Sequence, residues 1–281
     1  MEKYALSIGE RWLPYRKTGA GFNFTIHSTF NKVINISTNQ GLLSVAAENS
    51  GGSSSFLTVS GNYVDYGACP GQQCHVNAGN INLANQTINF SNAKLWKGPI
   101  AKGYRNSIKS ENIAAFRAVL DRKAPPQSAW RFIQSDMVNR FQGLRGIMKL
   151  SENPQEARNL VGLGPGLTPS GDDMLIGFMA IANHTYENRE FVRLLHSAIA
   201  SLLPRTTDIS AQALSNALDR DYCESVQNCI RDLCEGSKEE VYISAASLMN
   251  IGATSGSDIA CGMYFGMIQK QGAAYEIKNP A

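Results

Sequence analysis

The frame S-G-x-D-x-x-x-G occurs twice in this chain, opening first at Ser170 and again at Ser255. Each copy passes from a polar loop that contains glycine into a run that is apolar on every side, at residues 174–182 and 259–268. A helix that is apolar all round is typically buried. The repeat therefore predicts two central buried helices in mutual contact.

In both copies the serine stands three residues before an aspartate, Asp173 in the first and Asp258 in the second. This is the spacing at which an N-cap side chain and an N3 side chain satisfy the free amides of a helix start. We therefore expect a Ser–Asp capping pair to begin each helix.

Glycines occupy matching places in the two copies. Those at the second position are expected to supply unusual backbone angles, and those further along leave room for a neighbouring helix backbone. The first pair is Gly171 and Gly256, and the second set is Gly177, Gly262 and Gly266.

The two helix starts together predict a binding site for a small anion, because free amide N–H groups and the positive end of the helix dipole attract negative charge. Carboxylates beside them can accept hydrogen bonds from an amide or an amine, or hold a metal ion. The candidate catalytic residues are Asp172, Asp173 and Asp258. The candidate anion-binding residues of the two loops are Gly164, Gly166, Thr168, Ser170, Gly171, Thr254, Ser255, Gly256 and Ser257. The alternative is a pair of ordinary helix caps, but the repetition and the constrained loop G-L-G-P-G-L-T-P favour a functional site.

A third loop, R-T-T-D-I-S at 205–210, follows a proline and precedes a predicted helix. Thr207 and Asp208 are suited to cap that helix, and Arg205 offers a planar cation for a carboxylate or a phosphate. Among the four histidines, His27 is a secondary candidate. None of the four stands three or four residues from another histidine or a cysteine, so no metal centre is predicted from them.

The 281 residues predict two domains, with a boundary after residue 108. From 22 to 90, short β-favouring runs alternate with turn residues, which predicts an antiparallel sheet or a small barrel. The expected strands are 22–27, 32–36, 42–46, 56–59, 76–83 and 87–90. Residues 109–281 have helical periodicity. Besides the two apolar runs, the expected helices are 111–123, 129–148, 155–161, 188–203, 210–218, 222–234 and 238–249. The fold class is α+β.

Composition narrows the choice of partners and compartment. A net charge of +3 without a basic run argues against a nucleic-acid partner. The longest apolar stretches are about half of the roughly 20 residues that span a bilayer, so no membrane partner is expected. The six cysteines are thinly spread and the start lacks the apolar stretch of a signal peptide, which predicts a cytoplasmic protein.

The segments G-L-G-P-G-L-T-P-S-G-D-D-M-L-I-G-F (162–178) and G-A-T-S-G-S-D-I-A-C-G (252–262) resemble those of a bacterial family of unknown function. That family includes the third subunit of the oxamate carbamoyltransferase of allantoin degradation. The resemblance extends to a β-rich front containing F-N-F-T-I-H-S-T-F-N-K-V-I-N-I and a helical rear containing R-T-T-D-I-S.

The resemblance implies a carbamoyltransferase subunit of purine catabolism, which converts oxalurate and phosphate into oxamate and carbamoyl phosphate. It implies a small anionic, amide-containing metabolite at the two helix starts, other enzyme subunits as partners, and no required cofactor. Two alternatives stay open. The chain is a non-catalytic structural partner of another subunit, or it is a Mg²⁺-dependent phosphate-ester or nucleotide enzyme that uses the aspartates as metal ligands.

Overall fold

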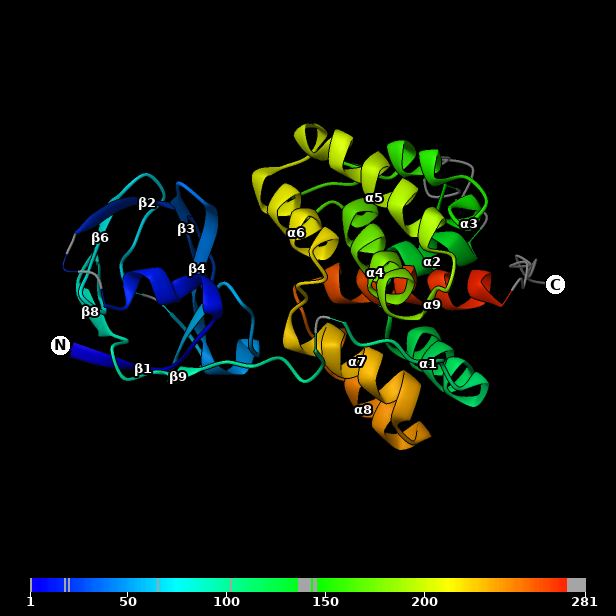
Figure 1. Cartoon of the computed structure of the whole chain (residues 1–281), viewed down its shortest axis with the longest axis horizontal. Helices are drawn as coiled ribbons and strands as arrows, with labels where there is room; N and C mark the ends of the chain where they lie inside the picture. The colour runs from blue at the N-terminus through cyan, green and yellow to red at the C-terminus, as the bar shows by residue number, and fades with distance from the viewer. Residues whose placement is uncertain are drawn as a thin grey trace. The chain divides into compact units, whose positions relative to one another are not determined.

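A computed structural model describes residues 2–17, 19, 21–64, 66–101, 103–135, 143 and 146–271. The chain divides into two compact units, residues 1–98 and 99–281 (Figure 1). Each unit has its own hydrophobic core. The division falls about ten residues before the expected one, because Ile100, Tyr104 and Ile108 already pack against the core of the second unit.

The first unit is a closed β-barrel. Its strands are β1 (Glu2–Ile8), β2 (Phe22–Thr29), β3 (Val33–Thr38), β4 (Gly41–Ala47), β5 (Phe56–Val59), β6 (Gln73–Asn77), β7 (Asn80–Leu83), β8 (Gln86–Asn89) and β9 (Lys94–Leu95). They follow the order β5-β4-β3-β2-β6-β7-β8-β1-β9, and an additional pairing of β5 with β1 closes the barrel. The expected α+β class is thus confirmed, with the barrel as its first part. Most pairings are antiparallel, but β4–β5, β1–β8 and β1–β9 are parallel.

Two features of the barrel differ from the expected strands. The expected strand 76–83 is a hairpin of β6 and β7, because Ala78 and Gly79 adopt φ angles of 46° and 76° and reverse the chain between them. The strand β1 was not expected, yet it pairs with both β5 and β8 and so completes the barrel.

A short 3₁₀ helix after β1, η1 (Glu10–Tyr15), contributes aromatic side chains to the core of the barrel unit. The indole ring of Trp12 is buried and contacts the ring of Phe90 edge-on, and its N–H group donates to the carbonyl of Ser55 at 2.9 Å. A second 3₁₀ turn, η2 (Glu48–Ser50), follows β4.

The second unit is helical. Its elements are α1 (Ser110–Lys123), α2 (Ala129–Gln134), α3 (Gly146–Lys149), η5 (Pro154–Asn159), α4 (Ser170–Thr185), α5 (Arg189–Leu202), η6 (Leu203–Arg205), α6 (Asp208–Leu218), α7 (Glu224–Glu235), α8 (Lys238–Leu248) and α9 (Ser255–Lys270). The expected helix 129–148 is wrong in its extent, since α2 ends at Gln134; its residues 136–142 and 144–145 lie outside the described part of the chain. The expected helix 155–161 is a 3₁₀ segment.

Helices α4 and α9 form the centre of this unit. All residues from Gly171 to Thr185 and from Gly256 to Ile268 are buried. A Cβ atom on Gly177 would lie 1.9 Å from the carbonyl oxygen of Ile259, and one on Gly262 would lie 1.9 Å from that of Met174. The prediction of two buried helices in mutual contact is therefore confirmed, and glycine allows their backbones to touch.

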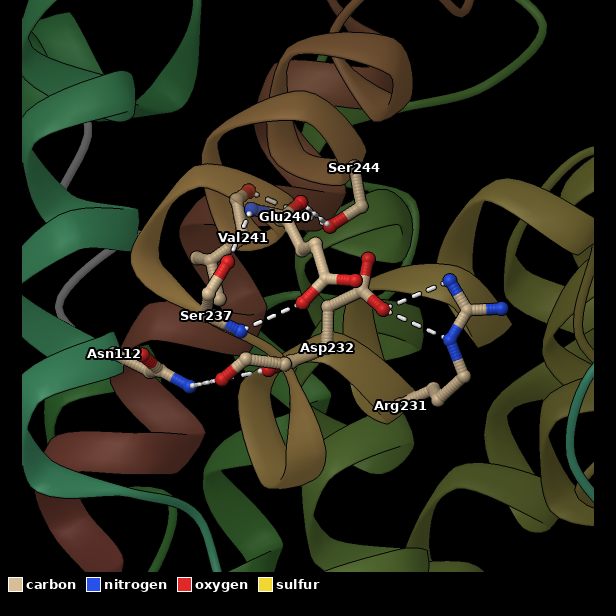
Figure 2. A network of polar contacts seen from close by, with 8 residues as sticks. Asn112, Arg231, Asp232, Ser237, Glu240, Val241 and Ser244 are labelled. Carbon is tan, nitrogen blue, oxygen red and sulfur yellow. Dashed lines mark hydrogen bonds and ion pairs between the residues drawn. The ribbon is translucent and has the colours of Figure 1, made fainter.

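A polar corner joins α1 to the turn between α7 and α8 (Figure 2). The buried amide of Asn112 donates to the carbonyls of Asp232, Leu233 and Gly236 at 3.1, 3.2 and 3.1 Å. Ser237 and Glu240 form a capping box at the start of α8. This corner holds the outer helices in place beside the central pair.

None of the helices in the described part of the chain is long and apolar enough to cross a bilayer.

Candidate functional site

The two helix starts that carry the repeated frame lie together. The hydroxyl oxygens of Thr168, just before α4, and Ser255, the first residue of α9, are 2.8 Å apart. Further along both helices, a Cβ atom on Gly266 of α9 would lie 3.0 Å from the Cβ of Ile181 of α4, so the helices cross with their amino ends on the same side.

Serine and aspartate pair across the two helices rather than within one. The hydroxyl of Ser255 lowers the pKa of Asp173 as a hydrogen-bond donor, and the hydroxyl of Ser170 does the same for Asp258. The expected capping pairs are wrong, since the N-caps are Pro169 and Thr254 and neither makes a side-chain cap bond. The Ser-x-x-Asp spacing instead joins one helix start to the other.

The glycines at the second position of each frame act by their small size. Neither Gly171 nor Gly256 has a positive φ, so the expectation of unusual backbone angles is wrong for both. A Cβ atom there would lie 2.0 Å from the carbonyl oxygen of Leu160 and 1.9 Å from that of Leu248, respectively. Each glycine thus lets the preceding segment press against the first turn of the helix.

The amides of these glycines already have partners within the protein. Gly171 donates to the carbonyl of Leu163 at 2.8 Å, and Gly256 donates to that of Ile251 at 3.0 Å. Four half-buried hydroxyls also stand at the helix starts, those of Thr168, Ser170, Thr254 and Ser255.

Asp172 holds neighbouring segments together. One of its carboxylate oxygens accepts from the amide of Gly162 at 2.9 Å, and the other accepts from the hydroxyl of Thr206. Burial raises the pKa of Asp172, and these bonds oppose the rise. Because both oxygens are occupied, this side chain joins α4 to the loop before it and to the segment before α6.

Asp173 and Asp258 are buried carboxyls that each keep an oxygen without a partner among the described residues, Oδ2 in both cases. The other oxygen of Asp258 accepts from the amide of Ala129, at the start of α2, at 2.6 Å. Burial raises the pKa of Asp258 to about 6. It raises the pKa of Asp173 well above the ordinary value, and the nearby Asp258 and Asp172 add to that rise. Ser257 also has a buried hydroxyl without a partner in the described part of the chain.

The loop before α4 reaches the surface. Gly164 and Gly166 have φ angles of 125° and 88°, which glycine adopts without strain, and both are exposed. The next carbonyl, of Leu167, accepts from the hydroxyl of Thr207 at 2.6 Å. Thr207 also caps α6 by accepting from the amide of Ser210 at 3.2 Å.

The R-T-T-D-I-S segment therefore lies beside the first motif, because Thr206 donates to Asp172 and Thr207 donates to the carbonyl of Leu167. The guanidinium of Arg205 is exposed and donates to the carbonyl of Arg158 at 3.5 Å, and Asp208 is exposed as well. His27 lies in β2 of the barrel unit, where a ring nitrogen is 3.1 Å from the hydroxyl of Ser28.

Two hydrogen-bond donors to these carboxyls were not expected from the sequence. They are the hydroxyl of Thr206, which donates to Asp172, and the amide of Ala129, which donates to Asp258. The segment P-P-Q-S before Ala129 indicates a helix start, but no local pattern links it to residues far along the chain. Within the described ranges, no group of three or more His, Cys, Asp and Glu side chains is placed to hold a metal ion.

Comparison with known proteins bears on both units. The family model described as oxamate carbamoyltransferase subunit AllH matches residues 160–267, and that described as AllH family N-terminal domain matches residues 4–95. No curated protein and no solved structure matches the chain. The first match contains both helix starts and the segment around Thr206, and the second spans the barrel strands. The chain belongs to the AllH family.

Proposed function

We propose that this chain is a cytoplasmic subunit of a carbamoyltransferase-like enzyme of purine and allantoin nitrogen catabolism, and that it binds a small anionic, amide-containing metabolite where α4 and α9 begin. The observation that supports the proposal is the meeting of two helix starts around Asp173 and Asp258, each with an unpaired carboxyl oxygen. Buried polar groups normally have partners, so unpaired ones at a helix start indicate a ligand.

The proposed reaction follows the family description, oxamate carbamoyltransferase subunit. A phosphate oxygen attacks the ureido carbon of oxalurate and forms a C–O bond. The C–N bond to the oxamate nitrogen breaks, and the proton of hydrogen phosphate passes to that nitrogen. The products are carbamoyl phosphate and oxamate. Such a reaction depends on positioning and charge stabilisation rather than on a covalent nucleophile.

The proposed role of each group of residues follows from its chemistry. The half-buried side chains of Thr168, Ser170, Thr254 and Ser255 would line the site and orient the two aspartates, and the exposed Arg205 would offer a cation to the anionic groups of the ligand. The unpaired oxygens of Asp173 and Asp258 would face its amide groups. The residues Gly164, Gly166 and Thr207 shape the loop over the site, and Asp172 holds that loop to α4.

The test is a thermal-shift screen of the purified chain, alone and with its partner subunits, against oxamate, oxalurate, carbamoyl phosphate, phosphate and Mg²⁺. A ligand that binds only the folded protein raises its melting temperature, by an amount that grows with concentration over Kd. We expect oxamate or carbamoyl phosphate to stabilise the chain, and Asp173→Asn and Asp258→Asn to abolish the shift. Asp219→Asn, which changes an exposed carboxylate at the end of α6, should leave it intact.

The remaining outcomes separate the alternatives. Stabilisation by none of these compounds, in any combination of subunits, would contradict the proposal. Carbamoyl phosphate formation that persists in the complex after both aspartates are replaced would assign this chain a structural role. Stabilisation by Mg²⁺ alone, lost in either variant, would instead support a metal-dependent phosphate-ester enzyme.

A further inference from the structure

The buried carboxyls Asp173 and Asp258 differ in what surrounds them. The side chain of Asp258 has an amide donor, Ala129, and the hydroxyls of Ser170 and Thr254 lower its pKa. For Asp173, the described part of the chain supplies one such donor, the hydroxyl of Ser255. The other groups that shift the pKa of Asp173 are the carboxyls of Asp258 and Asp172, which raise it further. Among the described residues, no cation is one of the groups that shift the pKa of either carboxyl.

The carboxyls of Asp173 and Asp258 cannot both be ionised in these buried surroundings. Asp173 is 4% exposed and Asp258 is 0% exposed, so water does little to stabilise either anion. Neighbouring buried carboxyls without a cation retain a proton between them. That proton belongs on Asp173, because three donors stabilise the anion of Asp258 and one stabilises that of Asp173. The stronger rise in the pKa of Asp173 agrees with this order.

We propose, on the basis of the function proposed above, that Asp173 serves the site as an uncharged hydrogen-bond donor and Asp258 as an anionic acceptor, so that the site selects a carbamoyl, carboxamide or ureido group over a carboxylate of the same shape. The two unpaired Oδ2 atoms are the contacting atoms.

The selection follows from complementary donors and acceptors. An amide carries a C=O group and an N–H group side by side, which match one donor and one acceptor. A carboxylate offers two acceptors and a negative charge, so it leaves the Asp258 oxygen unpaired and is repelled by it. A mismatch of this kind weakens binding by about tenfold to a hundredfold.

The first test needs no ligand. Infrared spectroscopy of the purified chain, compared in H₂O and D₂O at pH 7, should contain the C=O stretch of a protonated aspartic acid. Asp173→Asn should remove this band, and Asp219→Asn should retain it. Absence of the band from the unmodified protein, or its persistence in Asp173→Asn, would overturn the proposed proton position. Loss of the band on addition of Mg²⁺ would instead overturn the proposed selection of an amide, because a metal ion would then replace the proton.

The second test compares oxamate with oxalate, which differ only in one amide against one carboxylate. Calorimetric titration should give a Kd for oxamate about tenfold to a hundredfold lower than that for oxalate. Asp258→Asn should narrow the difference, since its amide group can donate to a carboxylate. Equal affinity in the unmodified protein would overturn the selection alone. Binding of neither compound, with or without the partner subunits, would overturn the proposed function as well, while the infrared result would still decide the protonation of Asp173.

Discussion

At the scale of single residues, the contact between the central helices depends on positions that have no side chain. Gly177 and Gly262 lie at symmetric points of the crossing, and at each the opposite helix presents a backbone carbonyl where a Cβ atom would stand. A backbone group cannot rotate away as a flexible side chain can. The helix starts can approach one another only because both positions are glycine.

Replacing Gly262 with alanine should therefore destabilise the protein. Alanine gains about 1 kcal/mol over glycine in a helix interior, but overpacking against a backbone carbonyl costs more, and we expect a net loss of about 2 kcal/mol. Chemical denaturation measures the difference. Gly103→Ala is the control, because nothing lies within 4 Å of its Cβ position, and it should change stability by less than about 0.5 kcal/mol. Equal stability of the two variants would contradict the close helix contact.

The carboxyl of Asp258 should make stability depend on pH. Its pKa is raised from the ordinary value of 3.8 to about 6, so between these values the folded protein binds a proton that the unfolded chain releases. This contribution is fully present below about pH 4 and is lost as pH rises to about 6, a decrease of about 3 kcal/mol in the free energy of unfolding. Asp173, whose pKa is also raised, acts in the same direction.

Denaturation curves at several pH values between 4 and 7 test this expectation. Asp258→Asn keeps an oxygen for the amide of Ala129 and carries no charge, so its stability should fall less over this range. Asp219→Asn should follow the unmodified protein. A steeper fall in Asp258→Asn than in the unmodified protein would show that the carboxyl is not the group responsible.

At the scale of elements, the same local spacing produces two different structures. Ser237 and Glu240 form a capping box within α8, whereas Ser170 and Asp173 belong to α4 but pair with α9. A glutamate has the reach to return to its own N-cap. In α4 the nearer partner of the serine and of the aspartate lies on α9. Spacing indicates a polar helix start, while the identity of the partner depends on packing.

The α8 cap offers a stability test outside the candidate site. Ser237→Ala should cost about 1 kcal/mol, the usual contribution of a serine N-cap, and thermal or chemical unfolding measures it. Ser247→Ala, at an exposed position in the last turn of the same helix, is the matched control and should be nearly neutral. If the two variants are equally stable, the capping box contributes nothing measurable.

At the scale of the whole molecule, the two units have separate hydrophobic cores. The core of the barrel includes Trp12 and Phe90, and the core of the helical unit is centred on α4 and α9. A segment with its own core can fold alone. Each unit also exceeds the size below which a single core becomes marginal.

We therefore expect the fragments 1–98 and 99–281 to fold separately. Each should unfold cooperatively when it is produced alone, with near-ultraviolet circular dichroism from its own buried aromatic residues. The second fragment should retain the helical content of its part of the intact chain. A fragment without a cooperative transition would show that its core depends on the other unit.

The sequence by itself determined what periodicity and composition can determine. Two apolar runs gave two buried helices, the turn-rich segment gave a β unit, and most outer helices lie within a few residues of the expected ranges. The glycines at 177 and 262 were likewise correctly interpreted as places of close approach. These features depend on neighbours along the chain, so a local pattern records them.

Tertiary structure alone decided the rest. These features all join residues from different elements. They are the closure of the barrel by β1, the Ser–Asp pairs between α4 and α9, the hydrogen bonds from Gly162 and Thr206 to Asp172, and the hydrogen bond from the amide of Ala129 to Asp258. Hydrogen bonds and desolvation act over a few ångströms in space, whatever the separation in sequence. The sequence therefore does not distinguish the carboxyls of Asp172, Asp173 and Asp258. Their surroundings separate the one that holds a loop from the two that each keep an oxygen without a partner in the described part of the chain.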